Sequence, residues 1–433
     1  MKHSNRSRHT IIKELATYIS GGANSPGRKF SEVTTPIIIA DKASGSYIWD
    51  SEGTRYVDFI MGLGPCLLGH SPDCVVDAIK EQASRGLVLG LTHRSEAELS
   101  KIIVNSSKHI DKVRFTCSGT EAVMTALRIA RGITQKQIVV KFSGGYHGHC
   151  DTILSGANKK EISDNFGTDG IHSSFKNATI TCRYNDIEQI KSIFSQYSDE
   201  IAAVIIEPVA TNMGLVPAQI EFLKTLRVLC SKQNSLLIFD EVVSGYRFGF
   251  GPVSNELGIY PDLTTFGKII GGGLAIGAYG GSDSVMAQVS NEGGVFQGGT
   301  FAGNPLTMTA GISTLRSLED GSVYEGLDAI TDVFTRELSY KFKEYGINFN
   351  VVKKGPLVSL ILVESLTNLT SLDDVQKQDQ TIFSSLHQKL CEQGYLIPPT
   401  IEEPLFFCSQ HTEQQILELA QLIAFHLNTI CHE

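Results

Sequence analysis

The stretch Leu236–Gly273 constrains this chain more than any other. It opens with a short apolar run, Leu236–Phe239, which is typical of a buried strand in a parallel sheet. That run leads into Asp240, and a second strand-like run, Leu263–Phe266, ends just before Lys268. In open α/β sheets, ligands bind outside the carboxyl ends of the strands. We therefore expect Asp240 and Lys268 to face one crevice.

A carboxylate and a lysine that face one crevice suit the cofactor pyridoxal 5'-phosphate (PLP). The lysine forms a Schiff base with the cofactor, and the acid keeps the ring nitrogen protonated. A lysine taken alone is usually a solvated surface charge, because lysine is rarely buried without a partner. At Lys268, the preceding strand, the upstream Asp240 and the following Gly271-Gly272-Gly273 together favour the catalytic interpretation.

These segments resemble the class III aminotransferases, and within that family the glutamate-1-semialdehyde aminomutase branch. The resemblance extends from about Gly21 to about Glu402. It implies an α/β protein of fold type I, with a large PLP-binding domain, whose mostly parallel sheet is flanked by helices, and a smaller α+β domain. We expect an N-terminal segment with a small meander over residues 1–60, the large domain over 61–305 and the small C-terminal domain over 306–433.

Composition bounds the class of protein. A chain of 433 residues with 42% hydrophobic and 19% charged residues is expected to form two globular domains. The net charge of −9 argues against nucleic acid or an anionic membrane as a partner. We expect no membrane span, because no apolar run approaches ~18 residues, and no secretory signal, because no apolar segment follows the basic first ten residues. Nine cysteines without a CxxC pair are typical of reduced thiols, so we expect a cytoplasmic protein.

A second segment suits an anion. Ser118, Gly119 and Thr120 stand between a strand-like run, Val113–Thr116, and a helical pattern, Glu121–Gly132. The free amide N–H groups and the dipole of a helix start favour a negative charge there. Taken alone, the segment is an ordinary helix N-cap. The resemblance implies that these three residues hold the phosphate of PLP.

The apolar run Ile138–Phe142 is followed by Tyr146, His147, His149 and Cys150. The two histidines and the cysteine suggest zinc ligands at first reading. A structural zinc site needs about four ligands, and no partner cluster follows downstream, so we expect no metal. The resemblance instead implies that Tyr146 stacks on the pyridine ring and that His147 lies beside the substrate.

The remaining cofactor contacts are implied by the resemblance alone. It places Asn212 beside the hydroxyl of PLP, and it places Val242 and Tyr146 on the two faces of the ring. It also implies that Thr300 reaches the phosphate bound by a neighbouring subunit. The expected assembly is therefore a homodimer with shared active sites.

Besides His147, three residues are expected to bind the substrate, a small amino or keto acid. Arg28 lies in a glycine-rich loop that composition alone would make a linker, but its planar guanidinium suits a carboxylate. The resemblance adds Ser25 and Glu402. No arginine follows Arg336, so the C-terminal domain lacks the extra carboxylate-binding arginine that many class III relatives place there.

Two departures from the aminomutase pattern separate the functional hypotheses. Leu63 stands where the family often carries a tryptophan, and residues 151–177 lack the glycine- and threonine-rich pattern of the family's gating loop. Both favour an aminotransferase that moves an amino group between an amino acid and a carbonyl compound bearing a carboxylate. The alternative, glutamate-1-semialdehyde 2,1-aminomutase, is favoured by Asn212 and the three substrate residues. The third hypothesis is a non-catalytic interaction protein that kept the fold.

Overall fold

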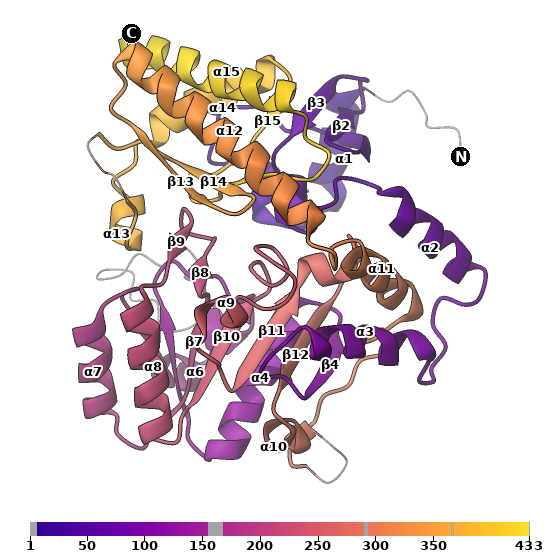
Figure 1. Cartoon of the computed structure of the whole chain (residues 1–433), viewed down its shortest axis with the longest axis vertical. Coiled ribbons are helices and arrows are strands. Elements are labelled where there is room, and N and C mark those ends of the chain that lie inside the picture. The colour runs from indigo at the N-terminus through magenta and orange to yellow at the C-terminus, as the bar shows by residue number, and fades with distance from the viewer. Residues whose placement is uncertain (1–6, 155–167, 290–292, 365, 367, 433) are drawn as a thin grey trace. The chain divides into compact units, whose positions relative to one another are not determined.

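The computed structural model of the chain describes all residues except 1–6, 155–167, 290–292, 365, 367 and 433 (Figure 1). It divides into two compact units. The first comprises Met1–Pro72, Glu325–Leu369 and Val375–Glu433, and the second comprises Asp73–Tyr324 and Thr370–Asp374. The boundaries between these units differ from those expected after residues 60 and 305. Residues 61–72 group with the first unit, and residues 306–324 group with the second. The division into domains stays a prediction.

A mixed sheet forms the centre of the second unit. Among the described residues it has seven strands in the order β4-β12-β11-β10-β7-β5-β6. Only β12 runs antiparallel to its neighbours, and the other pairs are parallel, which confirms the expected α/β fold class. The strands are β4 (Lys112–Thr116), β5 (Ile138–Phe142), β6 (Thr179–Cys182), β7 (Ile201–Ile206), β10 (Leu236–Glu241), β11 (Leu263–Gly267) and β12 (Gly277–Gly281).

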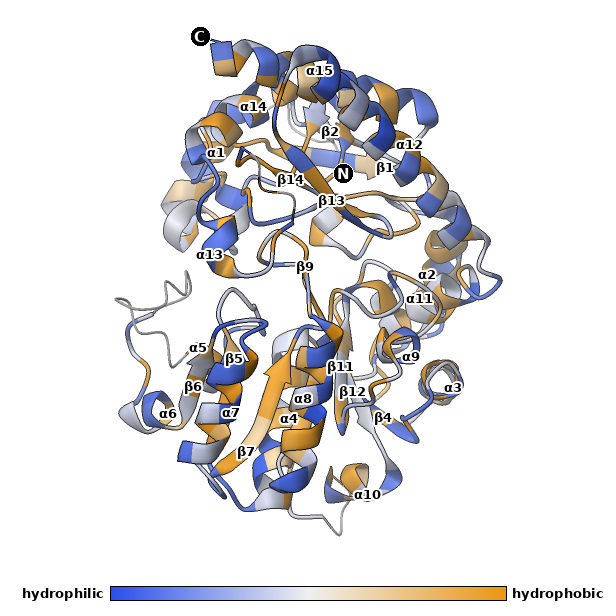
Figure 2. Ribbon diagram, turned by 60° about the vertical axis from the view of Figure 1, so that its left-hand side comes forward, coloured by the Kyte–Doolittle hydropathy of each residue, from blue (hydrophilic) through white to orange (hydrophobic). Residues whose placement is uncertain are grey.

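Burial on both faces explains why these runs are strands. Every residue of β5 and β7 is buried, and β7 is a continuously hydrophobic arrow in Figure 2. On β5, Val139 joins a core cluster with α4 (Gly119–Thr134). Phe142, three residues later, packs edge-on against Phe222 of α8 (Ile220–Lys232). Because side chains alternate along a strand, these contacts place helices on both faces of the sheet.

Shorter helices and a small hairpin complete the second unit. The helix α11 packs against α2 and α3. These elements are α2 (Asp73–Ala83), α3 (Arg94–Asn105), α5 (Asp151–Leu154), α6 (Ser173–Asn177), α7 (Ile187–Gln196), β8 (Val209–Ala210), β9 (Val216–Pro217), α9 (Ser254–Leu257), α10 (Asp283–Met286), α11 (Pro305–Arg316) and α13 (Leu372–Val375).

The first unit contains the expected antiparallel meander of β1, β2 and β3, to which β15 adds in parallel. A second small sheet pairs β14 with β13 and β16. No helix in the described part of the chain is long and apolar enough to cross a bilayer. The elements are α1 (Arg8–Tyr18), β1 (Ala40–Ser44), β2 (Tyr47–Asp50), β3 (Arg55–Asp58), α12 (Ser322–Tyr345), β13 (Asn350–Lys354), β14 (Leu357–Ile361), α14 (Gln380–Glu392), β15 (Tyr395–Leu396), β16 (Leu405–Phe406) and α15 (Glu413–His432).

Two histidines contact the buried end of β3, one with a lowered pKa and the other with a raised pKa. His411 stacks on Phe59 with ring centroids 4.1 Å apart, and burial lowers its pKa to about 3. His70 lies 2.7 Å from the carboxylate of Asp58. Burial lowers the pKa of His70, but hydrogen bonds to Asp58 and Cys66 outweigh burial and raise it to about 9. His70 is therefore a cation at neutral pH.

The free energy of unfolding is expected to decrease as the pH rises through about 9, because this stabilisation needs protonated His70. In an unfolded chain histidine titrates near pH 6.5, so the contribution is complete below that pH and is lost above the folded-state pKa. Urea unfolding at about pH 6.5 and about pH 9.5 measures it. The variant His70→Gln should lose this difference, whereas the exposed control His9→Gln should keep it. Parallel pH profiles for His70→Gln and the parent protein would contradict this assignment.

Candidate active site

Two adjacent strands bring Asp240 and Lys268 to the same edge of the sheet. β10 and β11 are parallel, and Asp240 pairs in register with Thr265. Lys268 follows the end of β11 and begins a short 3-10 helix, Lys268–Gly271. Its backbone is left-handed, with φ +47°, a conformation that non-glycine residues rarely adopt and that clusters at functional sites. Lys268 is half-buried.

The Asp240 carboxylate is 4% exposed and is held by donors from three places. Nδ1 of His147 lies 2.8 Å from Oδ2, and the hydroxyl of Thr265 donates to Oδ1 over 3.1 Å. The backbone N–H of Val242 donates to Oδ1 over 3.1 Å. Because an ionised carboxylate only accepts hydrogen bonds, this set of partners fits a negative charge fixed at the edge of the sheet.

The predicted anion site forms the start of α4. The Ser118 hydroxyl accepts from the N–H of Glu121 over 3.2 Å, so Ser118 is the N-cap. The amide N–H groups of Gly119 and Thr120 belong to the first helical turn, where donors have no partner inside the helix. They point out of a helix of 16 residues, whose dipole adds positive potential at this end.

Close glycine contacts join this turn to the neighbouring strands. A Cβ on Gly277 of β12 would stand 2.0 Å from the carbonyl oxygen of Ser118. A Cβ on Gly119 would stand 3.0 Å from both methyl groups of Val242, and one on Gly267 would stand 3.1 Å from the first of them. The Val242 side chain therefore lies between the anion-binding turn and the residue before Lys268. Gly277 was not predicted from the sequence, since nothing in its local sequence marks this long-range contact.

The loops after β5 and β7 are joined by a buried acid. Glu207 directly follows β7, and its Oε1 accepts the N–H of Tyr146 over 3.0 Å. The side-chain nitrogen of Asn212 lies 3.1 and 3.0 Å from the two carboxylate oxygens. Burial raises the pKa of Glu207. The ring of Tyr146 is 39% exposed, and burial followed by the charge of Asp240 raises the pKa of its hydroxyl.

For four predicted site residues the structure gives local contacts that do not test their roles. Ser25, Arg28 and Glu402 belong to the first unit. There, the N–H of Arg28 donates to the carbonyl of Ser25 over 3.1 Å, and the N–H of Glu402 donates to the hydroxyl of Thr400 over 3.1 Å. Thr300 is an exposed residue of the second unit. The roles assigned to these four residues stay predictions.

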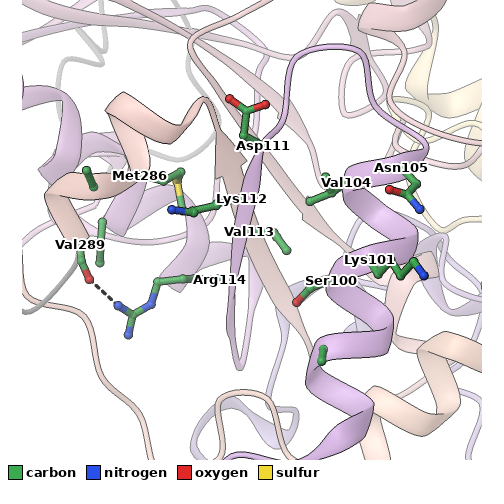
Figure 3. Close-up of a pocket in the computed structure, with 12 residues that line it drawn as sticks. Ser100, Lys101, Val104, Asn105, Asp111, Lys112, Val113, Arg114, Met286 and Val289 are labelled. Atoms are coloured by element: carbon green, nitrogen blue, oxygen red, sulfur yellow. Dashed lines mark hydrogen bonds between the residues drawn. The ribbon is translucent and has the colours of Figure 1, made fainter.

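A surface hollow elsewhere on the second unit contains none of the predicted site residues (Figure 3). Its walls come from α3, β4 and the segment around α10. The guanidinium of Arg114 donates to the carbonyl of Val289 at one side of it. Two residues earlier on the same face of β4, Lys112 pairs with Asp283 at 2.7 Å. Two of its cationic groups are thus already engaged by protein oxygens.

The variant Gly277→Ala is expected to displace the anion-binding turn, because the new methyl group would overlap the carbonyl of Ser118. We expect the free energy of unfolding to fall by about 1–3 kcal/mol, the usual cost of overpacking, and the affinity for PLP to fall with it. Urea unfolding and PLP titration measure the two effects. The control is Gly249→Ala, whose Cβ would meet nothing within 4 Å. Equal effects of the two substitutions would refute the contact.

The chain is similar to known proteins over nearly its whole length. The sequence model of the family described as aminotransferase class-III matches residues 30–418. The glutamate-1-semialdehyde 2,1-aminomutase of Aquifex aeolicus is 40% identical over 95% of this chain and 97% of its own length. That of Desulforapulum autotrophicum is 41% identical over 94% and 95%. The structure of an omega-transaminase from Sphaerobacter thermophilus superposes with a TM-score of 0.88 at 27% identity, covering 97% of both chains. The chain therefore belongs to the class-III aminotransferase family, and it is a PLP-dependent enzyme of fold type I.

Proposed function

We propose that this protein is a glutamate-1-semialdehyde 2,1-aminomutase, which moves an amino group within one molecule to form 5-aminolevulinate. The observation that carries the proposal is the 40% identity to a relative of that name across 95% of this chain. Several further relatives of the same name match at similar identity. The hypothesis of a non-catalytic protein has no support among them.

The residues at the edge of the sheet fit PLP. When bound, PLP supplies a ring that withdraws electrons from the substrate carbon. Asp240, buried and ionised, would hold the ring nitrogen protonated, while the amide N–H groups of Gly119 and Thr120 would bind the phosphate. Val242, whose side chain lies between Gly119 and Gly267, would pack on one face of the ring, and Tyr146 would cover the other. Lys268 would bind the cofactor and then carry protons to and from the substrate.

We assign the substrate carboxylate to Arg28, with Ser25 and Glu402 beside it. The guanidinium of Arg28 is exposed, and a bidentate pair would orient a small substrate without a deep apolar pocket. The supporting observation is that no arginine follows Arg336 in the sequence. The C-terminal part of the chain therefore offers no later arginine for the carboxylate. Nδ1 of His147 lies 2.8 Å from Oδ2 of Asp240, so a contact of His147 with substrate would use the other ring nitrogen.

A second candidate, favoured by the sequence analysis, is an aminotransferase that takes its amino group from a separate donor. The supporting observation is Leu63, which stands in place of the family's tryptophan in a left-handed turn with φ +61°. The altered loop, residues 151–177, also supported it, but residues 155–167 lie outside the described part of the chain. The named relatives favour the aminomutase over this candidate.

We further propose a homodimer in which Thr300 completes the partner's phosphate site. Phe296 and Phe301 flank Thr300 and are 82% and 58% exposed. A second exposed apolar run, Leu87–Leu91, lies nearby, because His93 bonds the carbonyl of Gly303 over 2.7 Å. Exposed apolar patches of this kind mark protein interfaces.

We also place the protein in the cytoplasm, since all nine cysteines are free.

The amino donor distinguishes the two candidates. Enzyme loaded with PLP and its amino form is expected to convert glutamate-1-semialdehyde into 5-aminolevulinate over many turnovers without an added donor. An aminotransferase would stop after about one product per site until a donor amino acid is supplied. Product is quantified against enzyme concentration. The variant Lys268→Ala should keep its circular dichroism spectrum and form no product. Turnover that continues in Lys268→Ala would remove this lysine from the mechanism.

Mixed dimers test the shared site. We expect Lys268→Ala and Thr300→Ala homodimers each to be impaired, whereas a mixed dimer regains one site that contains both native residues. About half of its sites should then bind PLP with the parent affinity. Tagged subunits allow the mixed dimer to be purified, and PLP titration counts the sites. If Thr300 acts within its own subunit, mixing will restore no tight site.

A further inference from the structure

We propose that Glu207 is a positioning residue, which orients the side-chain amide of Asn212 so that one of its N–H groups is directed at the cofactor. The inference rests on the proposed function, in which Asn212 lies beside the hydroxyl of PLP. It concerns a residue outside the set of cofactor contacts. Glu207 follows the last residue of β7 at the edge of the sheet that carries Asp240.

The hydrogen-bond partners of Glu207 favour an ionised carboxylate. The side chain is 4% exposed. Oε1 accepts the N–H of Tyr146, and Oε2 accepts both the N–H and the hydroxyl of Thr211 over 3.2 Å. The carbonyl of Glu207 accepts the Tyr184 hydroxyl over 2.6 Å. A protonated carboxyl would place an O–H against N–H donors, so these hydrogen bonds favour the ionised form, while burial, the larger effect, keeps the pKa of Glu207 above its ordinary value.

The geometry of the amide leaves one N–H group that Glu207 does not accept. The Asn212 nitrogen lies 3.1 Å from Oε1 and 3.0 Å from Oε2. The two oxygens of a carboxylate are about 2 Å apart, so from this nitrogen they subtend roughly 40°, whereas the two N–H bonds of an amide diverge by about 120°. One N–H is therefore shared by both oxygens. The second N–H points away from Glu207.

Glu207 also fixes which end of the amide faces it. If the amide were flipped, its oxygen would lie against two carboxylate oxygens, which is repulsive, so the nitrogen must be on the Glu207 side. Without this carboxylate, both orientations of Asn212 become accessible. The same carboxylate holds the N–H of Tyr146. One buried charge thus positions both a ring-stacking residue and a hydrogen-bond donor.

A donor from Asn212 has a measurable effect on the bound cofactor. It stabilises the anionic form of the cofactor's hydroxyl, so it lowers the midpoint at which the visible absorption band of the loaded protein titrates with pH. The negative charge of Glu207 by itself acts in the opposite direction, since it stabilises the protonated cofactor. The two contributions therefore differ in sign.

The experiment is a pH titration of the visible absorption of PLP-loaded variants. Asn212→Ala is expected to raise the midpoint by about one unit, as loss of one hydrogen bond to a charged group does. Glu207→Gln should also raise it in the parent protein. In the Asn212→Ala background, Glu207→Gln should leave it unchanged or lower it, because only the charge remains. The control Thr211→Val, which removes one donor to Glu207 and keeps its charge, should leave the midpoint unchanged.

Other outcomes overturn the proposal. A lower midpoint in Asn212→Ala means that Asn212 does not donate to the cofactor. If Glu207→Gln shifts the midpoint by the same amount with Asn212 present and with Asn212→Ala, Glu207 does not orient Asn212. If Glu207→Gln fails to fold, Glu207→Asp replaces it in the test. The shorter side chain keeps the negative charge but moves the carboxylate away from Asn212, so the midpoint should again rise. Failure of the proposed function is distinguishable, because the parent protein would then form no 5-aminolevulinate even with its absorption band intact.

Discussion

Burial of the Asp240 carboxylate is the constraint on which the site depends. A buried charge is costly unless donors surround it. Here, the donors come from the loop after β5, from β11 and from the backbone following β10. Three segments distant in sequence must therefore meet at one edge of the sheet for the chain to fold. Glu207 repeats the arrangement between the loops after β5 and β7, so two buried acids hold the loops proposed to surround the cofactor.

Close backbone approach is the second requirement. The turn at Ser118 can lie against β12 because Gly277 has no side chain, and Gly119 and Gly267 leave the space that Val242 occupies. Lys268 follows these contacts directly, in a left-handed backbone. The positive potential of the proposed anion site comes from the start of a helix. Its position depends on glycines, which lack the methyl groups that would prevent the close approach. Charge and shape thus have separate structural origins in the second unit.

The elements recovered from sequence are those with strong local signals. The runs expected at Ile138–Phe142 and Leu263–Phe266 became β5 and β11, because buried parallel strands are continuously apolar. The helix expected after Ser118 begins at Gly119, since Ser118 is its N-cap. α3 was not expected, and its apolar face is narrow, with only Leu99 and Ile103 buried. α7 was also missed, although its periodic isoleucines carried a signal. β12, with the sequence GAYGG, has no strand signal at all.

By itself, the sequence determined the buried strands, the capped helix and the residue types that end them, because hydrophobic periodicity and capping are local properties. It also indicated that Asp240 and Lys268 belong to one edge, since parallel strands end together. Only the tertiary structure decided that β12 lies between β4 and β11, that Val242 sits between two glycines and that Glu207 meets Asn212. These features depend on contacts between distant segments, and a residue's neighbours in sequence carry no record of which atoms packing will bring against it.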